Sequence, residues 1–183
     1  MKKAVLLVLI LAIILRGNAS AQAGNLDSTF GINGKVTTSL ASGNEGNIIY
    51  DMEVQSDGKI IAVGKADIPG PPDCAYGLAR YQTNGKLDST FAGYGAIMGG
   101  FGNYTYSSAR LIVLQADGKI LIGGDAFYSA MARYNSNGTI DYDFGNNGEV
   151  EFAELGFGLG SMGLQSDEKI IVGGGEIPES GFH

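Results

Sequence analysis

The chain has 183 residues, of which 30 are glycine and 44% are hydrophobic, and it contains no tryptophan. This composition excludes a disordered chain and is typical of a turn-rich globular protein. The 19 acidic residues outnumber the 12 basic ones, for a formal charge of −7. An acidic surface repels phosphate groups, which argues against nucleic acids and anionic membranes as partners.

The first 23 residues have the pattern of a secretory signal peptide. Lys2 and Lys3 precede an apolar run over residues 4–15, and the small-residue stretch GNASAQAG follows. We expect cleavage after Ala21 or Ala23 and export to the periplasm, the cell surface or the extracellular medium, with no membrane span left in the mature chain. The run is shorter than the roughly 20 residues of a membrane-spanning helix, and an uncleaved anchor is the alternative.

Loss of this segment would remove three basic residues and no acid, which leaves nine basic against nineteen acidic residues and a formal charge of −10. Cys74 is the only cysteine, which excludes an intrachain disulfide, and we expect its thiol to be buried or packed in a loop. His183 is the only histidine and the last residue. Nucleophilic catalysis by a serine or cysteine paired with histidine therefore finds no support.

One eleven-residue motif occurs three times after this segment: LDSTFGINGKV from Leu26, LDSTFAGYGAI from Leu87 and IDYDFGNNGEV from Ile140. A second string recurs in step with it, as VQSDGKIIAVG, LQADGKILIGG and LQSDEKIIVGG. Successive copies lie 50 to 61 residues apart, a spacing typical of repeat folds and near the blade length of kelch-type propellers. The spacing divides residues 24–183 into units of about 26–86, 87–139 and 140–183, the last one incomplete.

Each unit has the pattern of a four-stranded antiparallel sheet. Alternating apolar residues predict a first strand before the repeated glutamine, and the runs KIIAVG, KILIGG and KIIVGG predict a second strand buried on both faces. A third strand is predicted over YGLARY and YSAMARY, and a fourth over KVTTSL and, with a weaker pattern, over GAIMGG and EVEFAEL. Turn dipeptides separate these strands: Asp57-Gly58 and Asp117-Gly118 after the first, and Asn84-Gly85 and Asn137-Gly138 after the third.

The repeated motif is predicted to carry the chain from one sheet to the next. Its aromatic residues, Phe30, Phe91 and Phe144, are expected to fill the seams between sheets. Burial of each ring would stabilise the fold by about 1.5–3 kcal/mol.

The charged residues around the motif are expected to be structural. Asp27, Asp88 and Asp141 stand where a carboxylate can cap the turn by accepting backbone N–H bonds. Arg80 and Arg133 occupy equivalent strand positions, and we expect them to form ion pairs with Asp88 and Asp141 in every unit.

Taken together, these strings resemble the delta-60 repeats of bacterial secreted proteins, whose pattern is roughly ARYNxDGxLDxxFGxxGxV followed by QxDGKIxxxG. The resemblance covers nearly all of the chain after the signal peptide. It implies an all-β fold whose units are blades of a β-propeller-like array, in a family whose biochemical role is mostly unassigned. Two positions depart from the pattern. Ala92-Gly93 alters the second motif, and Glu168 replaces a turn glycine, where a side chain at positive φ costs on the order of 1 kcal/mol.

Three units cannot close a propeller ring, which has about four to eight blades. We therefore expect an incomplete propeller that is part of a longer protein, with an open arc of stacked sheets as the alternative. Either arrangement leaves open strand edges. The remaining blades of a parent chain would cover these edges, or the edges would drive self-association.

Several short strings match functional motifs without the required context. Asp143-Phe144-Gly145 matches the magnesium-binding tripeptide of protein kinases, and residues 158–163 fit G-x-G-x-x-G, but neither has the surrounding motifs. The repeated Asp-Gly turns carry a lysine where calcium ligands would gather, so hairpin turns are favoured. Asp141-Tyr142-Asp143 is the strongest remaining metal candidate, and glycosylation sequons begin at Asn103 and Asn137.

Two functions remain open. Regular repeats, export and acidity favour a non-catalytic secreted module, a scaffold or binding platform for protein or glycan, with no cofactor, metal or catalytic residue assigned. The alternative is a propeller hydrolase or lyase that uses carboxylates or calcium in a central channel, although no spacing of acids singles out a pair.

Overall fold

The computed structural model describes residues 24–40, 46–68, 74–102, 106–152 and 157–176. The predicted signal peptide and the sequon at 103–105 lie outside these ranges. Within them the fold is all-β, as predicted, and has no helix long and apolar enough to cross a membrane. The first sheet holds β1 (Ile48–Val54), β2 (Ile60–Asp67), β3 (Cys74–Tyr81) and β4 (Ala96–Gly99); the second holds β5 (Ser108–Leu114), β6 (Ile120–Asp125), β7 (Ser129–Tyr134) and β8 (Glu149–Glu151); the third holds β9 (Phe157–Leu164) and β10 (Ile170–Glu176).

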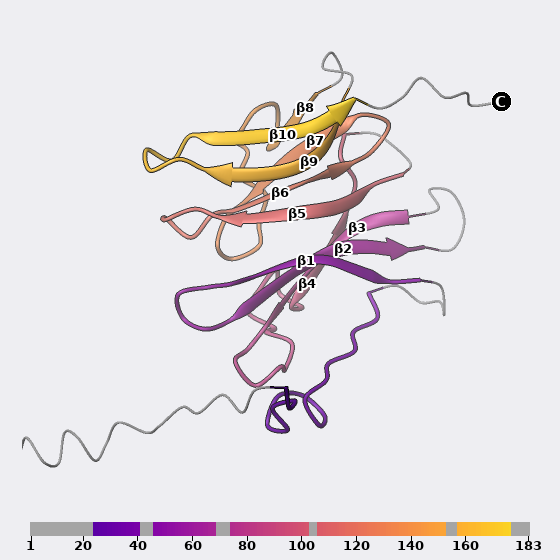
Figure 1. Cartoon of the computed structure of the whole chain (residues 1–183), viewed down its shortest axis with the longest axis vertical. Helices are drawn as coiled ribbons and strands as arrows, with labels where there is room; N and C mark the ends of the chain where they lie inside the picture. The colour runs from indigo at the N-terminus through magenta and orange to yellow at the C-terminus, as the bar shows by residue number, and fades with distance from the viewer. Residues whose placement is uncertain (1–23, 41–45, 69–73, 103–105, 153–156, 177–183) are drawn as a thin grey trace, which may run out of the picture.

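The three sheets are stacked face to face along the longest axis of the molecule (Figure 1). In the two four-stranded sheets the strands follow chain order, and each is antiparallel to the next. The first strands β1, β5 and β9 lie on the near side of the stack in Figure 1, and β4 and β8 lie behind them. This is the arrangement of neighbouring propeller blades, and the described sheets form an arc that does not close into a ring.

Tight hairpin turns join the first and second strands of each sheet. Gly58 and Gly118 have φ of 81° and 83°, as the Asp-Gly pattern predicts. Asp57 and Asp117 each accept the backbone N–H of the lysine two residues later at 3.0 Å. At the third turn Glu168 has φ of 64°, so its side chain is held in the left-handed conformation that glycine adopts in the other two turns.

The first strand of every sheet contains a β-bulge at the same place in the repeat. In β1 the register shifts between Ile49 and Asp51, and β5 and β9 shift at equivalent positions. A Cβ on Gly64 would lie only 1.8 Å from the carbonyl oxygen of Ile48, and the equivalent contact at Gly124 would be 1.9 Å. These glycines are therefore required by the close approach of the bulged backbone.

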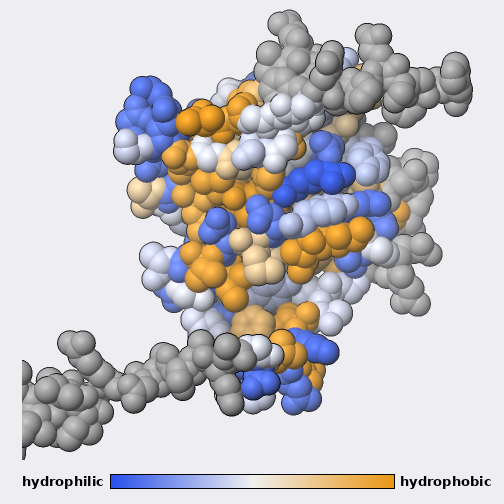
Figure 2. Space-filling model, in the orientation of Figure 1, coloured by the Kyte–Doolittle hydropathy of each residue, from blue (hydrophilic) through white to orange (hydrophobic). Residues whose placement is uncertain are grey.

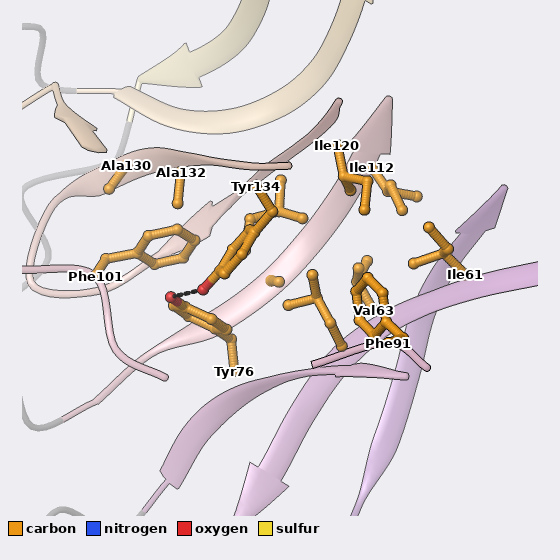
Figure 3. Packing of buried hydrophobic residues seen from close by; sticks show 13 residues of the cluster. Ile61, Val63, Tyr76, Phe91, Phe101, Ile112, Ile120, Ala130, Ala132 and Tyr134 are labelled. Atoms are coloured by element: carbon orange, nitrogen blue, oxygen red, sulfur yellow. Dashed lines mark hydrogen bonds between the residues drawn. The ribbon is translucent and has the colours of Figure 1, made fainter. Parts of the chain in front are cut away.

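The main core lies between the first and second sheets (Figure 3). The prediction that the second strand is buried on both faces is confirmed for β2 and β6 but wrong for β10, whose Ile171 is 53% exposed. No sheet in the described chain covers the outer face of β10. The side chains that meet in the core are fully or almost fully buried: Ile61, Val63 and Leu78 from the first sheet, and Ile112, Ile120 and Ile122 from the second.

The repeated motif connects strands within one sheet, so the prediction that it links successive sheets is wrong. Residues 87–95 lie between β3 and β4, and residues 140–148 lie between β7 and β8. The motif turns the chain back so that the residues after it pair with the third strand. The chain passes to the next sheet only after β4 and β8, and the predicted unit boundaries at 87 and 140 fall inside sheets.

Residues 35–40 do not form the predicted fourth strand. Lys35 makes isolated bridges to Gly31 and Ile32, and the following residues are irregular. In the other two repeats the corresponding residues pair with the preceding third strand. No described strand precedes the first motif, so this segment has no such partner among the described residues. The fourth strand thus forms where its pairing partner is present.

Candidate functional site at the seams between sheets

A buried ion pair lies at the motif of the first sheet. Arg80 Nε donates to Asp88 Oδ2 at 2.9 Å, and Asp88 is only 2% exposed. Thr90 donates its backbone N–H and its hydroxyl to Asp88 Oδ1, at 3.1 and 2.7 Å. The Lys59 amine lies 3.4 Å from the same carboxylate. Asp88 therefore caps the turn and is also the anion of the expected ion pair.

The second sheet repeats this arrangement. Arg133 Nε donates to Asp141 Oδ2 at 2.7 Å, and the lysine of the hairpin turn lies 3.2 Å from that oxygen. Asp141 also accepts the backbone N–H of Asp143 at 3.3 Å. Asp27 caps the first motif in the same way, through a hydrogen bond of 2.9 Å from a backbone N–H. The aspartate at this position therefore caps the turn in all three motifs.

Hydrogen bonds keep these carboxylates charged. The side-chain hydrogen bond from Thr90 is the main cause that lowers the pKa of Asp88 to about 2. Burial alone would raise the pKa of Asp141, but hydrogen bonds from Lys119 and Arg133 outweigh it, and the pKa is lowered. Both groups are ionised at neutral pH, which makes them unsuited to donate a proton as a general acid.

The aromatic residue of the motif packs beneath the arginine. Phe91 is fully buried, and the Arg80 guanidinium carbon lies 4.7 Å from its ring centroid. Arg133 lies over Phe144 in the same way, at 4.6 Å. The seam-filling role is confirmed for Phe91, whereas Phe30 and Phe144 are half-buried. Only Phe91 lies between two four-stranded sheets of the described chain.

The seam is completed by the turn that follows the third strand of the next sheet. The Ala92 N–H donates to the Asn137 carbonyl at 2.8 Å. Arg80 Nη1 donates to the Ser136 carbonyl at 2.7 Å. One arginine therefore holds an aspartate in its own sheet and a backbone carbonyl in the next, which fixes the two sheets relative to each other.

The glycine of the docked turn is enclosed by the motif. Gly138 has φ of 90°, and a Cβ on it would lie 2.9 Å from the Phe91 ring. The first motif binds the turn of the first sheet in the same way, because the Gly31 N–H donates to the Asn84 carbonyl at 2.8 Å. A Cβ on Gly85 would lie 2.9 Å from the Gly31 backbone. The turn must therefore present glycine at this point in both seams.

Sequence reasoning missed a second group, which lies at the bulges of the first strands. The Arg110 guanidinium carbon lies 4.9 Å from the Tyr50 ring centroid, and Arg110 Nε donates to Asp125. Nearby, Asp51 accepts the N–H of Ile112 at 3.0 Å across the two sheets. Bulged residues interrupt the alternation of a strand, so the sequence pattern carries no signal for this pair.

Sequence reasoning also missed a polar pair in the core. The hydroxyls of Tyr76 and Tyr134 lie 2.6 Å apart, so that one donates a hydrogen bond to the other (Figure 3). Burial raises the pKa of both tyrosines. The Phe101 ring packs on Tyr76 with a centroid distance of 4.7 Å. This hydrogen bond between two neutral side chains joins the first and second sheets.

The metal candidate lies at the ion pair of the second sheet, and the nucleotide candidate lies in a strand. Asp141 is held in its ion pair, Tyr142 is exposed, and residues 158–163 lie within the antiparallel strand β9 rather than in a phosphate-binding loop. Cys74 is buried, and its thiol donates to the Ser107 carbonyl at 3.6 Å. Across the described ranges, no group of three or more His, Cys, Asp and Glu side chains is placed to hold a metal ion.

Two stretches of the chain, residues 55–91 and 115–144, match a family model described as a domain of unknown function (DUF5122) of β-propeller type. Each match runs from the end of a first strand through the second and third strands to the phenylalanine of the motif. No curated protein and no solved structure matches the chain significantly. The two matches support a β-propeller-like repeat protein.

Proposed function

We propose that this protein is an exported, non-catalytic repeat module that acts as a scaffold or a binding platform for protein or glycan. The observation that carries the proposal is the use of the repeated charged residues. Two ion pairs, Arg80 with Asp88 and Arg133 with Asp141, occupy equivalent places in two sheets, and Arg80 also donates to the Ser136 carbonyl of the next sheet. Repetition of one contact in successive units is what a stack of sheets needs in order to be rigid.

The Tyr50–Arg110 pair supports a binding role for the near side of the stack. Tyrosine and arginine are enriched at the energetic centres of protein interfaces, and an aromatic ring can also pack on apolar ligand surface. Ile49 and Met52 of β1 lie close by in the chain and are more than half exposed. Figure 2 shows apolar side chains gathered on this face of the stack. An exposed apolar surface with an adjacent aromatic and arginine is typical of an interaction site.

The proposal is tested with the purified full-length protein on a glycan array and against a panel of secreted proteins. A ligand of the wild type should bind the Tyr50→Ala and Arg110→Ala variants about tenfold more weakly. Tyr94→Ala is the matched control, because Tyr94 is an 85% exposed tyrosine of the second motif, away from this pair in the sequence. This variant should bind the ligand as tightly as the wild type. Hydrolysis or elimination of a substrate that is abolished by one carboxylate substitution would overturn the proposal.

A further inference from the structure

The third sheet presents β10 as an unpaired edge. In the first two sheets, β2 and β6 pair along their length with β3 and β7, starting from Ile60 with Tyr81 and Ile120 with Tyr134. Ile170 holds the equivalent position in β10, which pairs only with β9 among the described strands. β10 lies at one end of the stack (Figure 1, yellow). The N–H and C=O groups on its outer side, which no described strand pairs, are a template for an added strand.

A second feature is a turn socket, formed by Arg133 of β7 with Phe144 and Gly145 of the third motif. In the two other motifs, the amides of Gly31 and Ala92 bind the carbonyl of an Asn-Gly turn. Gly145 has φ of 55°, between the 58° of Gly31 and the 51° of Ala92. Within the described chain, neither the Gly145 N–H nor Nη1 of Arg133 has a hydrogen-bond acceptor. The socket therefore has the backbone conformation of an occupied seam and two donors without acceptors.

The cleft beside the socket is acidic. It encloses about 770 Å³ and is lined by Glu149 and Glu151. At the first motif the equivalent cleft is lined by Lys35 and Thr37 and by Lys86, the residue that follows the turn glycine. In the repeat alignment Glu149 and Glu151 replace Lys35 and Thr37. A lysine after the glycine of an incoming turn would thus face carboxylates of opposite charge.

We propose that the β10 edge and the turn socket form a docking site for an extended strand of another repeat unit that ends in an Asn-Gly-Lys turn. The strand adds to β10 in antiparallel pairing, the asparagine carbonyl accepts the Gly145 N–H, and the turn lysine faces Glu151. Backbone hydrogen bonds supply affinity, and the turn supplies specificity. The site is separate from the Tyr50–Arg110 surface, so binding of the strand and binding of a ligand at that surface can be tested independently.

A peptide with the sequence of residues 75–88, AYGLARYQTNGKLD, is the probe. Fluorescence anisotropy of the labelled peptide should show saturable binding to the full-length protein, with new hydrogen-exchange protection over β10. A peptide that carries Gly85→Val should bind about tenfold more weakly or less, because the added side chain meets the socket. In the first motif a Cβ at this glycine would lie 2.8 Å from Val36.

A charge swap tests the contact with the turn lysine. Glu151 is exposed, so Glu151→Lys should leave the fold intact, as circular dichroism will show, while weakening the binding of the probe severalfold. A peptide with Lys86→Glu should regain that affinity on the Glu151→Lys protein. The proposal is overturned if the probe does not bind saturably, if the Gly85→Val peptide binds equally well, if protection appears only in the first sheet, or if the swap restores nothing.

Discussion

The motifs of the first and second sheets use the same chemistry in different surroundings. Both pair an arginine with a buried aspartate, at 2.9 Å for Arg80 and 2.7 Å for Arg133. Phe91 is nevertheless fully buried, whereas Phe144 is only half-buried. The ion pair is local, since its partners are eight residues apart. Phe91 lies between two four-stranded sheets, whereas only two strands are described for the sheet that follows Phe144.

The largest expected difference between the two motifs lies in their aromatic residues. Phe91→Ala removes a fully buried ring and should lower the free energy of unfolding by about 3–5 kcal/mol. Phe144→Ala removes a half-buried ring, and the loss should be about 1 kcal/mol. Urea denaturation followed by circular dichroism measures both variants. Equal losses would show that the two rings have equivalent surroundings.

Substitution of the buried aspartate should have the next largest effect on the free energy of unfolding. Asp88→Ala leaves the Arg80 charge buried without its partner, and we expect a loss of about 3 kcal/mol. Asp141→Ala should be milder by about 1 kcal/mol, because the Arg133 side chain is 18% exposed and that of Arg80 only 8%. Urea denaturation at pH 7 compares the two variants. A greater loss in Asp141→Ala would contradict the ranking by burial.

Protonation of the Asp88 carboxylate should lower the free energy of unfolding at acid pH. The pKa of Asp88 is about 2, below its ordinary value of 3.8, because Thr90 and the neighbouring cations stabilise the charged form. A lowered pKa in the folded state adds stability that is present above pH 4 and is lost as the pH falls from 4 to 2. The wild type should lose this stability in that window. Asp88→Asn, which cannot titrate, should show a shallower dependence there.

Alanine substitutions at two turn glycines distinguish the cost of backbone strain from the cost of a steric clash in the seam. Gly118 and Gly138 have φ of 83° and 90°, so alanine at either position should cost about 1 kcal/mol from the left-handed conformation. A Cβ on Gly138 would also meet the Phe91 ring at 2.9 Å, whereas the nearest atom to one on Gly118 is 3.4 Å away. Gly138→Ala should therefore lose about 1 kcal/mol more than Gly118→Ala in urea denaturation. Similar losses would mean that the turn is not held tightly in the seam.

Features fixed by neighbouring residues could be predicted from the sequence. The Asp-Gly turns, the capping aspartates and the Arg–Asp pairs depend on short-range geometry, and the Ile- and Val-rich runs identify the second strands. The place of the motif in the topology could not be predicted, because the same string could follow the third strand into its own sheet or leave for another. Pairing of Ala96 to Gly99 with β3 decides this, and such long-range pairing has no signal in a single repeat.

The missed groups have a similar cause. Tyr50 and Arg110 are bulge residues whose sequence positions differ by a whole repeat, and Tyr76 and Tyr134 meet only because two sheets stack. A sequence pattern reports which side of a strand a residue occupies, but not what the facing sheet places opposite it. The repeat alignment itself still helps, because it shows which contacts of one seam have no counterpart in the next.

The smallest predicted effect concerns the third hairpin turn, where Glu168 has φ of 64° and the equivalent residues are Gly58 and Gly118. Glu168→Gly should relieve the left-handed strain and stabilise the β9–β10 hairpin by about 1 kcal/mol. Native-state hydrogen exchange should then show about fivefold slower opening of the hairpin amides. Glu168→Ala is the control, since it removes the carboxylate and keeps the strained Cβ, and it should give no gain. If Glu168→Ala stabilised the hairpin as well, the gain would come from loss of the glutamate carboxylate, which both variants share, and not from relief of the strained φ.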